Sequence, residues 1–262
     1  MELARLYPRT GRVMIEQHIL GLRLGERAPA GRALTVANFV SSLDGRASLQ
    51  GRSAGLGDAA DKAVFRALRR ASDAVLVGTG TLRAESYGRI VADPGARRAR
   101  EARGVSPEPL AVTLTRSGRL PLEIPLFAEP EARVIVFSGA EVNLEDARAQ
   151  VQVVRLDDDA LNFASALAHL RREHGVGLVL CEGVPRVLAA LLRERVLDQL
   201  CLSLAAKLTG GGHAPAITSG PELPEPADAE LEEVLQRDGT LFLRYCLRKS
   251  KMGFAEAPVV PQ

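Results

Sequence analysis

Short apolar runs that suit buried strands alternate along the chain with amphipathic stretches of helical period, and this order restricts the fold more than any other feature. Parallel strands need crossover connections, usually helices, so a repeated strand–helix–strand order predicts a parallel sheet with helices on its faces. The expected strands are 34–40, 73–78, 110–114, 133–137, 151–156, 176–181, 199–204, 230–236 and 240–247. The expected helices are 58–72, 160–173 and one that begins at Pro185. The last two strands flank Arg237, Asp238 and Gly239, which are typical of a hairpin turn. We therefore expect an α/β fold with a mostly parallel central sheet, flanking helices and a C-terminal antiparallel hairpin.

One domain is expected to account for most of the 262 residues. Residues 33–248 contain no linker-like break, whereas 249–262 is expected to be a disordered tail. Residues 1–32 carry six arginines among short apolar stretches. They are expected to form an N-terminal arm with one or two helical turns, and a partly ordered terminus is the alternative. Residues 93–109 are rich in proline, glycine and arginine, which predicts a surface loop.

The charge balance and the rarer residues exclude several classes of function. With 34 basic and 32 acidic residues the formal net charge is +2, too balanced for a dedicated nucleic-acid or membrane-surface protein. No apolar run reaches the roughly 18 residues of a membrane span, and the N-terminus lacks the apolar core of a signal peptide, so we expect a cytoplasmic protein. The three cysteines lie in apolar runs and the four histidines lack the spacing of a zinc site. We expect no metal, no nucleic-acid partner and no membrane partner.

Two of the expected strands end in glycine-rich turns. One is Val77–Thr81, and the other is Cys181–Val187, which runs into the helix that begins at Pro185. Glycine lets backbone N–H groups approach a phosphate, and a helix N-terminus adds partial positive charge. Two such turns at the carboxyl edge of a parallel sheet therefore predict a nucleotide site. Neither turn is a dinucleotide fingerprint or a P-loop, and an ordinary tight turn is the alternative for each of them.

Four sequence blocks carry a resemblance to a known family. They are S-L-D-G-R at 42–46, L-R-R-A-S-D-A-V-L-V-G-T-G-T at 68–81, L-V-L-C-E-G at 178–183, and L-L-R-E-R-V-L-D-Q-L-C-L-S-L-A-A-K-L-T-G-G-G at 191–212. In these blocks, and over about 33–248, the chain resembles the pyrimidine reductases of riboflavin biosynthesis, which have a dihydrofolate-reductase-like fold. The resemblance implies a homodimer that uses NADPH to reduce the ribose of a phosphoribosylamino-pyrimidine to its open ribityl form. The hydride would go to the anomeric carbon through the ring-opened imine.

The resemblance further implies a stand-alone reductase. The zinc signature of the deaminase found in bifunctional members, H-x-E with P-C-x-x-C, does not occur in the sequence. Asn38 stands where many bifunctional members have lysine, and stand-alone members often have asparagine there.

The resemblance also assigns roles to individual residues. For the cofactor it implies Val40, Ser41, Thr79, Gly80, Thr81, Gly183, Val184, Pro185, Arg186 and Val187, with Thr115, Arg116 and Ser117 at the adenosine 2′-phosphate. For the substrate it implies Asn38, Ser53, Arg69, Arg89 and Glu182. Arg69 would bind the phosphate through both prongs of its guanidinium, and Glu182 would accept hydrogen bonds from the aminopyrimidine. For catalysis it implies Glu85, near the reacting end of the cofactor, and Asp44, near the nicotinamide ribose. A solvated arginine is the alternative for Arg69 and Arg116, and a turn residue is the alternative for Asp44.

The sequence departs from the family pattern directly after the first glycine turn. The family commonly continues with A-D-D-P, a spacer and an arginine, whereas residues 84–89 here are A-E-S-Y-G-R. Glu85 keeps a carboxylate, and Arg89 would supply the phosphate contact from a shifted position. Val184 and Ala206 stand where the family usually has glycine and proline. These departures concern the substrate more than NADPH.

Three hypotheses for the function remain. The first is an NADPH-dependent reductase of 5-amino-6-(5-phosphoribosylamino)uracil or the equivalent pyrimidine-dione. The second is a reductase of the same fold with another small heterocyclic or imine substrate. The third is a non-catalytic nucleotide-binding protein, because a fold by itself does not fix a function.

Overall fold

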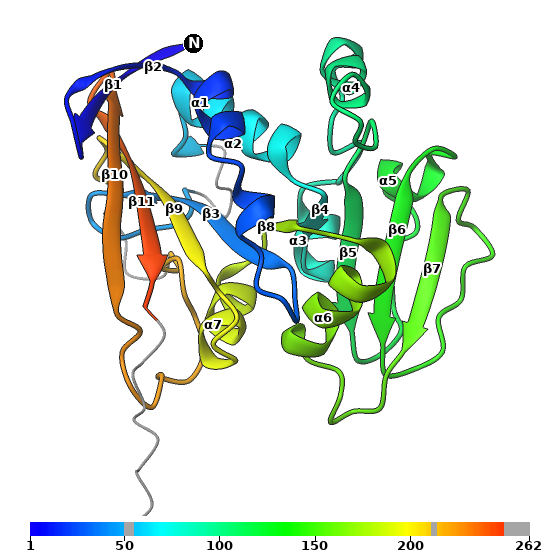
Figure 1. Ribbon diagram of the computed structural model, residues 1–262. Coiled ribbons are helices and arrows are strands. Elements are labelled where there is room, and N and C mark those ends of the chain that lie inside the picture. Colours follow the sequence, from blue (N-terminus) through cyan, green and yellow to red (C-terminus); the bar gives the residue numbers. More distant parts are fainter. Residues whose placement is uncertain (50–54, 211–213, 249–262) are drawn as a thin grey trace, which may run out of the picture.

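Parallel strands form the centre of the molecule, as the alternation in the sequence predicts (Figure 1). The computed structural model describes residues 1–49, 55–210 and 214–248. The strands are β1 (Glu2–Tyr7), β2 (Gly11–Met14), β3 (Leu34–Ser42), β4 (Ala74–Leu76), β5 (Leu110–Thr115), β6 (Arg133–Ser138), β7 (Gln150–Arg155), β8 (Leu178–Cys181), β9 (Gln199–Ala205), β10 (Ala229–Arg237) and β11 (Thr240–Leu247). The helices are α1 (Ile15–Gly21), the 3-10 turn η1 (Leu24–Arg27), α2 (Ala59–Ala71), α3 (Thr79–Ala84), α4 (Pro94–Glu101), α5 (Pro125–Ala128), α6 (Phe163–His174) and α7 (Pro185–Arg193).

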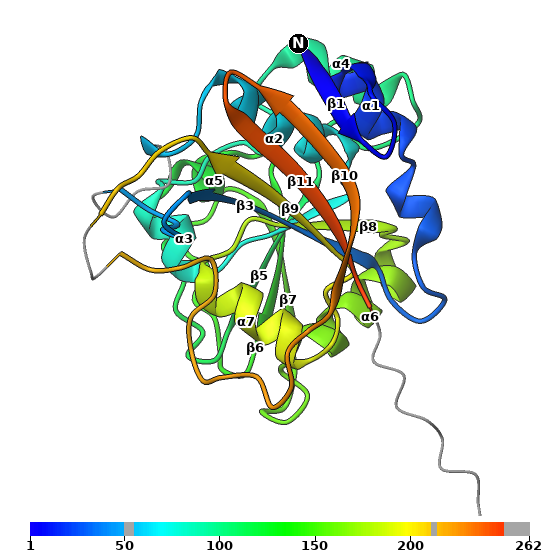
Figure 2. The same ribbon diagram turned by 90° about the vertical axis from the view of Figure 1, so that its left-hand side faces the viewer.

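The strands belong to one sheet in the order β2-β1-β10-β11-β9-β3-β8-β4-β5-β6-β7. From β9 to β7 every neighbouring pair is parallel. From β9 towards β2 every pair is antiparallel, and β10 and β11 form the predicted hairpin. The predicted fold class is therefore confirmed, and Figure 2 shows the twist of the sheet from its antiparallel end.

The two faces of the sheet pack against two separate apolar cores. Successive side chains of a strand point to opposite faces, so Val75 of β4 joins one core while Ala74 and Leu76 join the other. The first core packs against α1 and α2, and the second packs against α6 and α7 (Figure 1). No helix in the described part of the chain combines the length and the apolar character needed to cross a membrane.

The N-terminal segment differs from the prediction. Instead of an arm with one or two helical turns, residues 1–32 form a β-hairpin, α1 and η1, and β1 pairs with β10 to extend the sheet. Only Leu3 is buried in the two strands, so the apolar alternation that would reveal them is missing. The proposed division into an arm, a domain at 33–248 and a tail stays a prediction, and the tail 249–262 lies outside the described residues.

The predicted surface loop at 93–109 also differs, because it contains α4. Asp93 caps the helix by accepting hydrogen bonds from the N–H groups of Gly95 and Ala96, and Pro94 occupies its first turn. Ala96 and Arg100 are buried on one side of the helix. Four arginines among the 17 residues of 93–109 hide this face in the sequence, because only one apolar side chain marks it.

The middle of the sheet contains a gap that positions the site. β8 ends at Cys181, opposite Ala37 of β3, whereas β3 continues to Ser42. Beyond Ala37, β3 pairs within the described part of the chain with β9 alone, so no described strand covers its other edge. The two faces of the sheet therefore communicate through this opening, at the carboxyl end of the parallel strands, where ligands bind in open α/β sheets.

Candidate functional site

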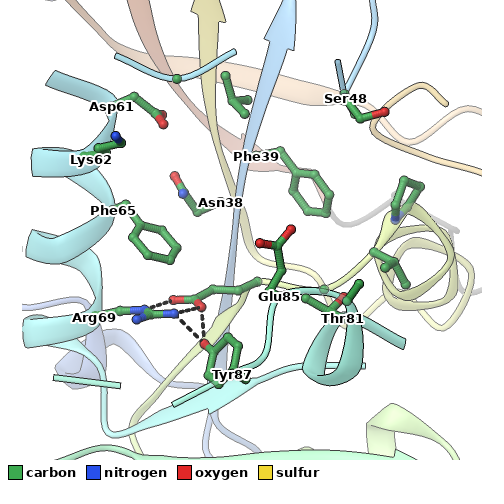
Figure 3. Close-up of a pocket in the computed structure, with 18 of the residues that line it drawn as sticks. Asn38, Phe39, Ser48, Asp61, Lys62, Phe65, Arg69, Thr81, Glu85 and Tyr87 are labelled. Carbon is green, nitrogen blue, oxygen red and sulfur yellow. Dashed lines mark hydrogen bonds and ion pairs between the residues drawn. The ribbon is translucent and has the colours of Figure 1, made fainter. Parts of the chain in front are cut away.

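A cavity of about 610 Å³ occupies the gap beside β3 (Figure 3). Asn38 points from β3 towards α2, and the adjacent Phe39 points to the other face of the sheet. We call the part lined by Asn38, Asp61, Lys62, Phe65 and Arg69 the α2 half. We call the part lined by Phe39, Thr81, Val184 and Pro185 the α7 half. Glu85, at the C-terminal end of α3, lies between the two halves.

A buried ion pair forms the floor of the α2 half. Arg69 donates from Nε to Glu182 Oε1 and from Nη2 to Glu182 Oε2, both at 2.7 Å. The Arg69 side chain is 16% exposed and that of Glu182 is 5% exposed. Tyr87 joins the pair through its hydroxyl, which accepts from Arg69 Nη2 at 2.6 Å and donates to Glu182 Oε2. The Arg69 guanidinium carbon also lies 4.2 Å from the centre of the Phe65 ring, a cation–π contact.

The pair shifts the pKa values of its members. Burial disfavours the charged guanidinium, but the Glu182 carboxylate more than offsets this, so the pKa of Arg69 is raised. Burial, followed by the charge of Glu182, raises the pKa of Tyr87 well above its usual value. Arg69 is therefore charged and Tyr87 neutral at all ordinary pH values.

This pairing concerns two of the expected substrate roles, which stay predictions. Arg69 makes a two-pronged contact with Glu182, and the solvated alternative is wrong because the side chain is largely buried. Glu182 accepts hydrogen bonds from Arg69 and Tyr87, so much of its accepting capacity is used inside the protein. A buried carboxylate without such partners would be costly, which explains why the pair forms.

Arg89 also lies differently from the prediction. It lines the cavity, but it donates to Glu108 at 3.0 Å and to Glu129 and Glu131 at 2.6 Å each. The hydrogen bonds to Glu129 and Glu131 raise the pKa of Arg89. Three carboxylates around one guanidinium leave a negative surplus, so this residue does not fit the predicted phosphate contact.

Asp44 and Ser41 lie outside the cavity lining. Asp44 accepts hydrogen bonds from the Ser42 hydroxyl, from the N–H of Thr209 at 3.3 Å and from the N–H of Gly210 at 2.8 Å. The hydrogen bond from Ser42 is the main cause that lowers the pKa of Asp44 to about 2. Asp44 thus ties the end of β3 to the segment after β9, which favours the turn alternative over the catalytic one. Ser53, predicted on the substrate side, lies outside the described residues.

The α7 half has the chemistry that a dinucleotide needs. The two predicted glycine turns lie side by side, because β4 and β8 are neighbouring parallel strands. Each turn leads into a helix, α3 or α7, and neither helix has a side-chain cap at its N-terminus. The hydroxyl oxygen of Thr81 is buried and has no hydrogen-bond partner within the described part of the chain. Uncapped helix N-termini favour an anion, so the residues present fit a nicotinamide dinucleotide.

Glycine is required at the second turn for a packing reason. A Cβ atom at Gly183 would lie 2.7 Å from the Val187 Cβ atom, in the first turn of α7. A larger residue would therefore push α7 away from the turn. Thr79, Gly80, Arg186 and Val187 occupy the first turns of α3 and α7 but do not line the cavity themselves.

The predicted 2′-phosphate site lies further along the same edge of the sheet. Thr115 ends β5, the neighbour of β4, and is followed by the exposed residues Arg116 and Ser117. The Arg116 side chain is 70% exposed and lies 3.8 Å from Asp158, an interaction too weak at the surface to hold it in place. Its assignment stays a prediction. Within the described ranges, no three His, Cys, Asp or Glu side chains come together as metal ligands.

Sequence reasoning missed part of the α2 half. Asp61 and Phe65 precede Arg69 by eight and four positions, and residues four apart lie on one face of a helix. Once Arg69 was assigned to the site, this period could have identified both residues. No helical period links Tyr87 to Arg69, because the turn that follows α3 brings the two residues together.

The sequence and the fold both match known proteins. Residues 33–242 match the model of the RibD C-terminal domain. The 2,5-diamino-6-ribosylamino-4(3H)-pyrimidinone 5′-phosphate reductase of Archaeoglobus fulgidus is 25% identical over 193 residues, which cover 72% of this chain and 87% of that protein. A pyrimidine reductase-like protein from Corynebacterium diphtheriae has a similar structure, with a TM-score of 0.73 and 24% identity over 90% of this chain and 100% of that one.

A bifunctional protein has the same fold in part of its length. The diaminohydroxyphosphoribosylaminopyrimidine deaminase/5-amino-6-(5-phosphoribosylamino)uracil reductase of Thermotoga maritima is similar with a TM-score of 0.64 and 24% identity. The match covers 83% of this chain but 57% of that protein. The family model covers most of the present chain, and the chain therefore belongs to the RibD C-terminal domain family.

Proposed function

We propose that the protein is an NADPH-dependent reductase of riboflavin biosynthesis that converts a phosphoribosylamino-pyrimidine to its ribitylamino form. Family membership supports a reductase, and the relative from Archaeoglobus fulgidus is named for this class of substrate. The observation that carries the proposal is the cavity that passes through the gap beside β3, because it gives two ligands separate walls and a common meeting point.

Each half of the cavity suits one ligand. The α7 half, with its uncapped helix N-termini and the unpaired hydroxyl of Thr81, would hold the cofactor, which supplies the hydride. The α2 half would hold the pyrimidine between Asn38 and Phe65. The buried oxygen of the Asn38 side chain has no partner within the described residues, so it is free to accept a hydrogen bond from the substrate. Glu85 lies where the two halves meet and would stabilise the iminium that accepts the hydride.

The direct test follows NADPH oxidation by its absorbance in the presence of a ribosylamino-pyrimidine 5′-phosphate. We expect oxidation that depends on this substrate and yields the ribitylamino product by mass spectrometry. Oxidation only with another heterocycle or imine would indicate a different reductase. Cofactor binding with no oxidation of NADPH by any of these compounds would favour the non-catalytic hypothesis.

The cofactor preference is a separate prediction. Arg116 lies beyond β5, where its guanidinium would contact a 2′-phosphate, so NADPH should bind about tenfold or more tightly than NADH. The Arg116→Ala variant should lose most of this preference, measured as the ratio of the two dissociation constants. Arg119→Ala is the matched control, because Arg119 is an exposed arginine in the same loop. Equal affinities in the parent protein would contradict the prediction.

A further inference from the structure

Asp61 is a carboxylate of the α2 half that none of the expected roles includes. It lies in the first turn of α2, where its backbone N–H donates to the helix cap Asp58 at 2.8 Å, and its side chain points into the cavity (Figure 3). A Cβ atom at Gly57 would lie 2.2 Å from Asp61 Oδ2. Glycine at position 57 therefore leaves the space in which this carboxylate turns towards the cavity.

The surroundings leave Asp61 short of partners. Burial raises the pKa of the Asp61 carboxyl, a hydrogen bond from Ser203 lowers it, and the nearby Asp58 raises it again. Within the described part of the chain, Asp61 forms no ion pair within 4 Å, and the neighbouring Lys62 acts on it only as a nearby charge. A half-buried carboxylate with one hydroxyl partner still has unused accepting positions, which favours a ligand that donates hydrogen bonds.

The Asn38 side-chain oxygen is a second hydrogen-bond acceptor on the same side of the cavity as Asp61. Ser203 of β9, which contacts Asp61, pairs in register with Val40 of β3, two residues from Asn38. Asn38 and Ser203 thus lie on neighbouring strands of the face covered by α2, and the Asn38 side-chain oxygen is buried without a partner among the described residues. The wall of the α2 half therefore presents two acceptors, Asp61 and the Asn38 oxygen, and it fits the edge of a ring that presents adjacent N–H groups.

We propose that Asp61 selects a pyrimidine that still carries a 2-amino group over the deaminated 2-oxo form. This inference rests on the proposed function and specifies its substrate class. In a 2-aminopyrimidin-4-one, the exocyclic amino group and the ring N3–H are adjacent donors, and one carboxylate accepts from both. In the corresponding dione, a carbonyl replaces the amino donor, so an oxygen would face the Asp61 carboxylate.

This orientation also directs the rest of the substrate. C6 of the ring, which carries the ribosylamino group, is opposite N3, so binding N3 at Asp61 points the ribose away from the start of α2. The ribose carbon that receives the hydride then lies towards the middle of the cavity, where Glu85 separates the two halves. Asp61 thus sets both the identity and the direction of the ring.

The test uses two free bases that differ only at C2, 2,5,6-triaminopyrimidin-4-one and 5,6-diaminouracil, titrated into the full-length protein by isothermal calorimetry. The parent protein should bind the triamino base at least about tenfold more tightly. Asp61→Asn keeps the shape but replaces one acceptor with a donor that suits the uracil carbonyl. Its preference should fall to about one or reverse. Asp159→Asn, at an exposed aspartate after β7, is the control and should keep the parental ratio.

Three results would overturn the inference: no binding of the triamino base, equal affinities in the parent protein, or an unchanged ratio in a folded Asp61→Asn variant. Turnover of the two ribosyl phosphates is measured separately. A protein that prefers the triamino base through Asp61 but reduces neither phosphate would refute the proposed reduction and leave the assignment of Asp61 intact.

Discussion

Glu85 points from the end of α3 into the middle of the cavity, and its side chain is exposed there rather than held by the fold. Its charge should therefore matter for turnover and little for stability. The Glu85→Gln variant keeps the shape of the side chain and removes the charge, so we expect unchanged thermal unfolding, unchanged NADPH binding and turnover reduced about 100-fold. A parental rate in this variant would show that Glu85 is only a surface residue at the end of α3.

Substitution of Arg69 or Glu182 should lower the stability of the fold, because the two side chains are buried against each other. Arg69→Met leaves the Glu182 carboxylate without its main partner, so the free energy of unfolding should fall by about 3–5 kcal/mol. Urea denaturation measures this loss. Adding Glu182→Gln to Arg69→Met should restore part of the stability, since the unpaired charge is then gone. A loss below about 1 kcal/mol in the single variant would mean that the pair is not structural.

Among the secondary-structure elements, α4 caps the C-terminal end of α2. Arg100 of α4 is 2% exposed and donates from Nη1 to the carbonyl oxygens of Arg70, at 2.6 Å, and Ser72, at 2.9 Å. These carbonyls belong to the last turn and the C-cap of α2, where helix carbonyls lack partners within the helix. Burial lowers the pKa of Arg100 to about 10, so it is still charged at neutral pH.

The substitution Arg100→Met should therefore destabilise the protein by about 3 kcal/mol, because the Ser72 carbonyl loses this donor and the Arg70 carbonyl keeps only the hydrogen bond from Arg103. Thermal or urea unfolding measures the change. Arg98→Met is the matched control, since Arg98 is exposed on the same helix and should have an effect within about 0.5 kcal/mol. Equal losses in the two variants would show that α2 does not depend on this cap.

The elements also show what the sequence could reveal. Helices such as α2 and α6 have long apolar stripes, and their positions could be predicted to within about three residues. The hairpin of β1 and β2 could not, because its strands are mostly exposed and are stabilised by pairing with β10, more than 200 residues away in the chain. The inner parallel strands β3, β4, β5, β6 and β8 were predictable since both of their faces are buried, whereas β7, at the edge of the sheet, is only partly buried.

The same distinction applies to the site. Its glycine turns are local features and were found from the sequence, and the resemblance to the family supplied Glu85. The partners of Arg69 and Arg89 were not, because both depend on carboxylates that the fold brings from distant segments. Resemblance to a family supplied the positions of these arginines but not the groups that occupy them in this chain.

At the scale of the whole molecule, the expected homodimer requires an exposed surface at which two copies of the chain can pair. The strand at 199–206 and the closing hairpin cannot provide that surface as sheet edges, because β9, β10 and β11 lie inside the sheet. The edges are β2 and β7, and the hairpin that contains β2 exposes Leu6, Met14 and Tyr7. An open edge with apolar side chains is suited to a second copy of the chain.

We expect a mass of about 56 kDa by light scattering at micromolar concentration, twice the 28.0 kDa of one chain. Met14→Lys should shift the protein towards the monomer by placing a charge on this edge. Leu208→Lys, at an exposed leucine elsewhere, should not. A parent protein of about 28 kDa would contradict the prediction.

The early end of β8 has a consequence for how this enzyme could be altered. In the proposed arrangement the two ligands would enter from opposite faces of one sheet and share only the passage beside β3. Substitutions on the cavity face of α2 would therefore change the choice of heterocycle and leave the nucleotide affinity alone, whereas changes at the start of α7 would do the reverse. One backbone interruption thus makes substrate and cofactor specificity independently adjustable.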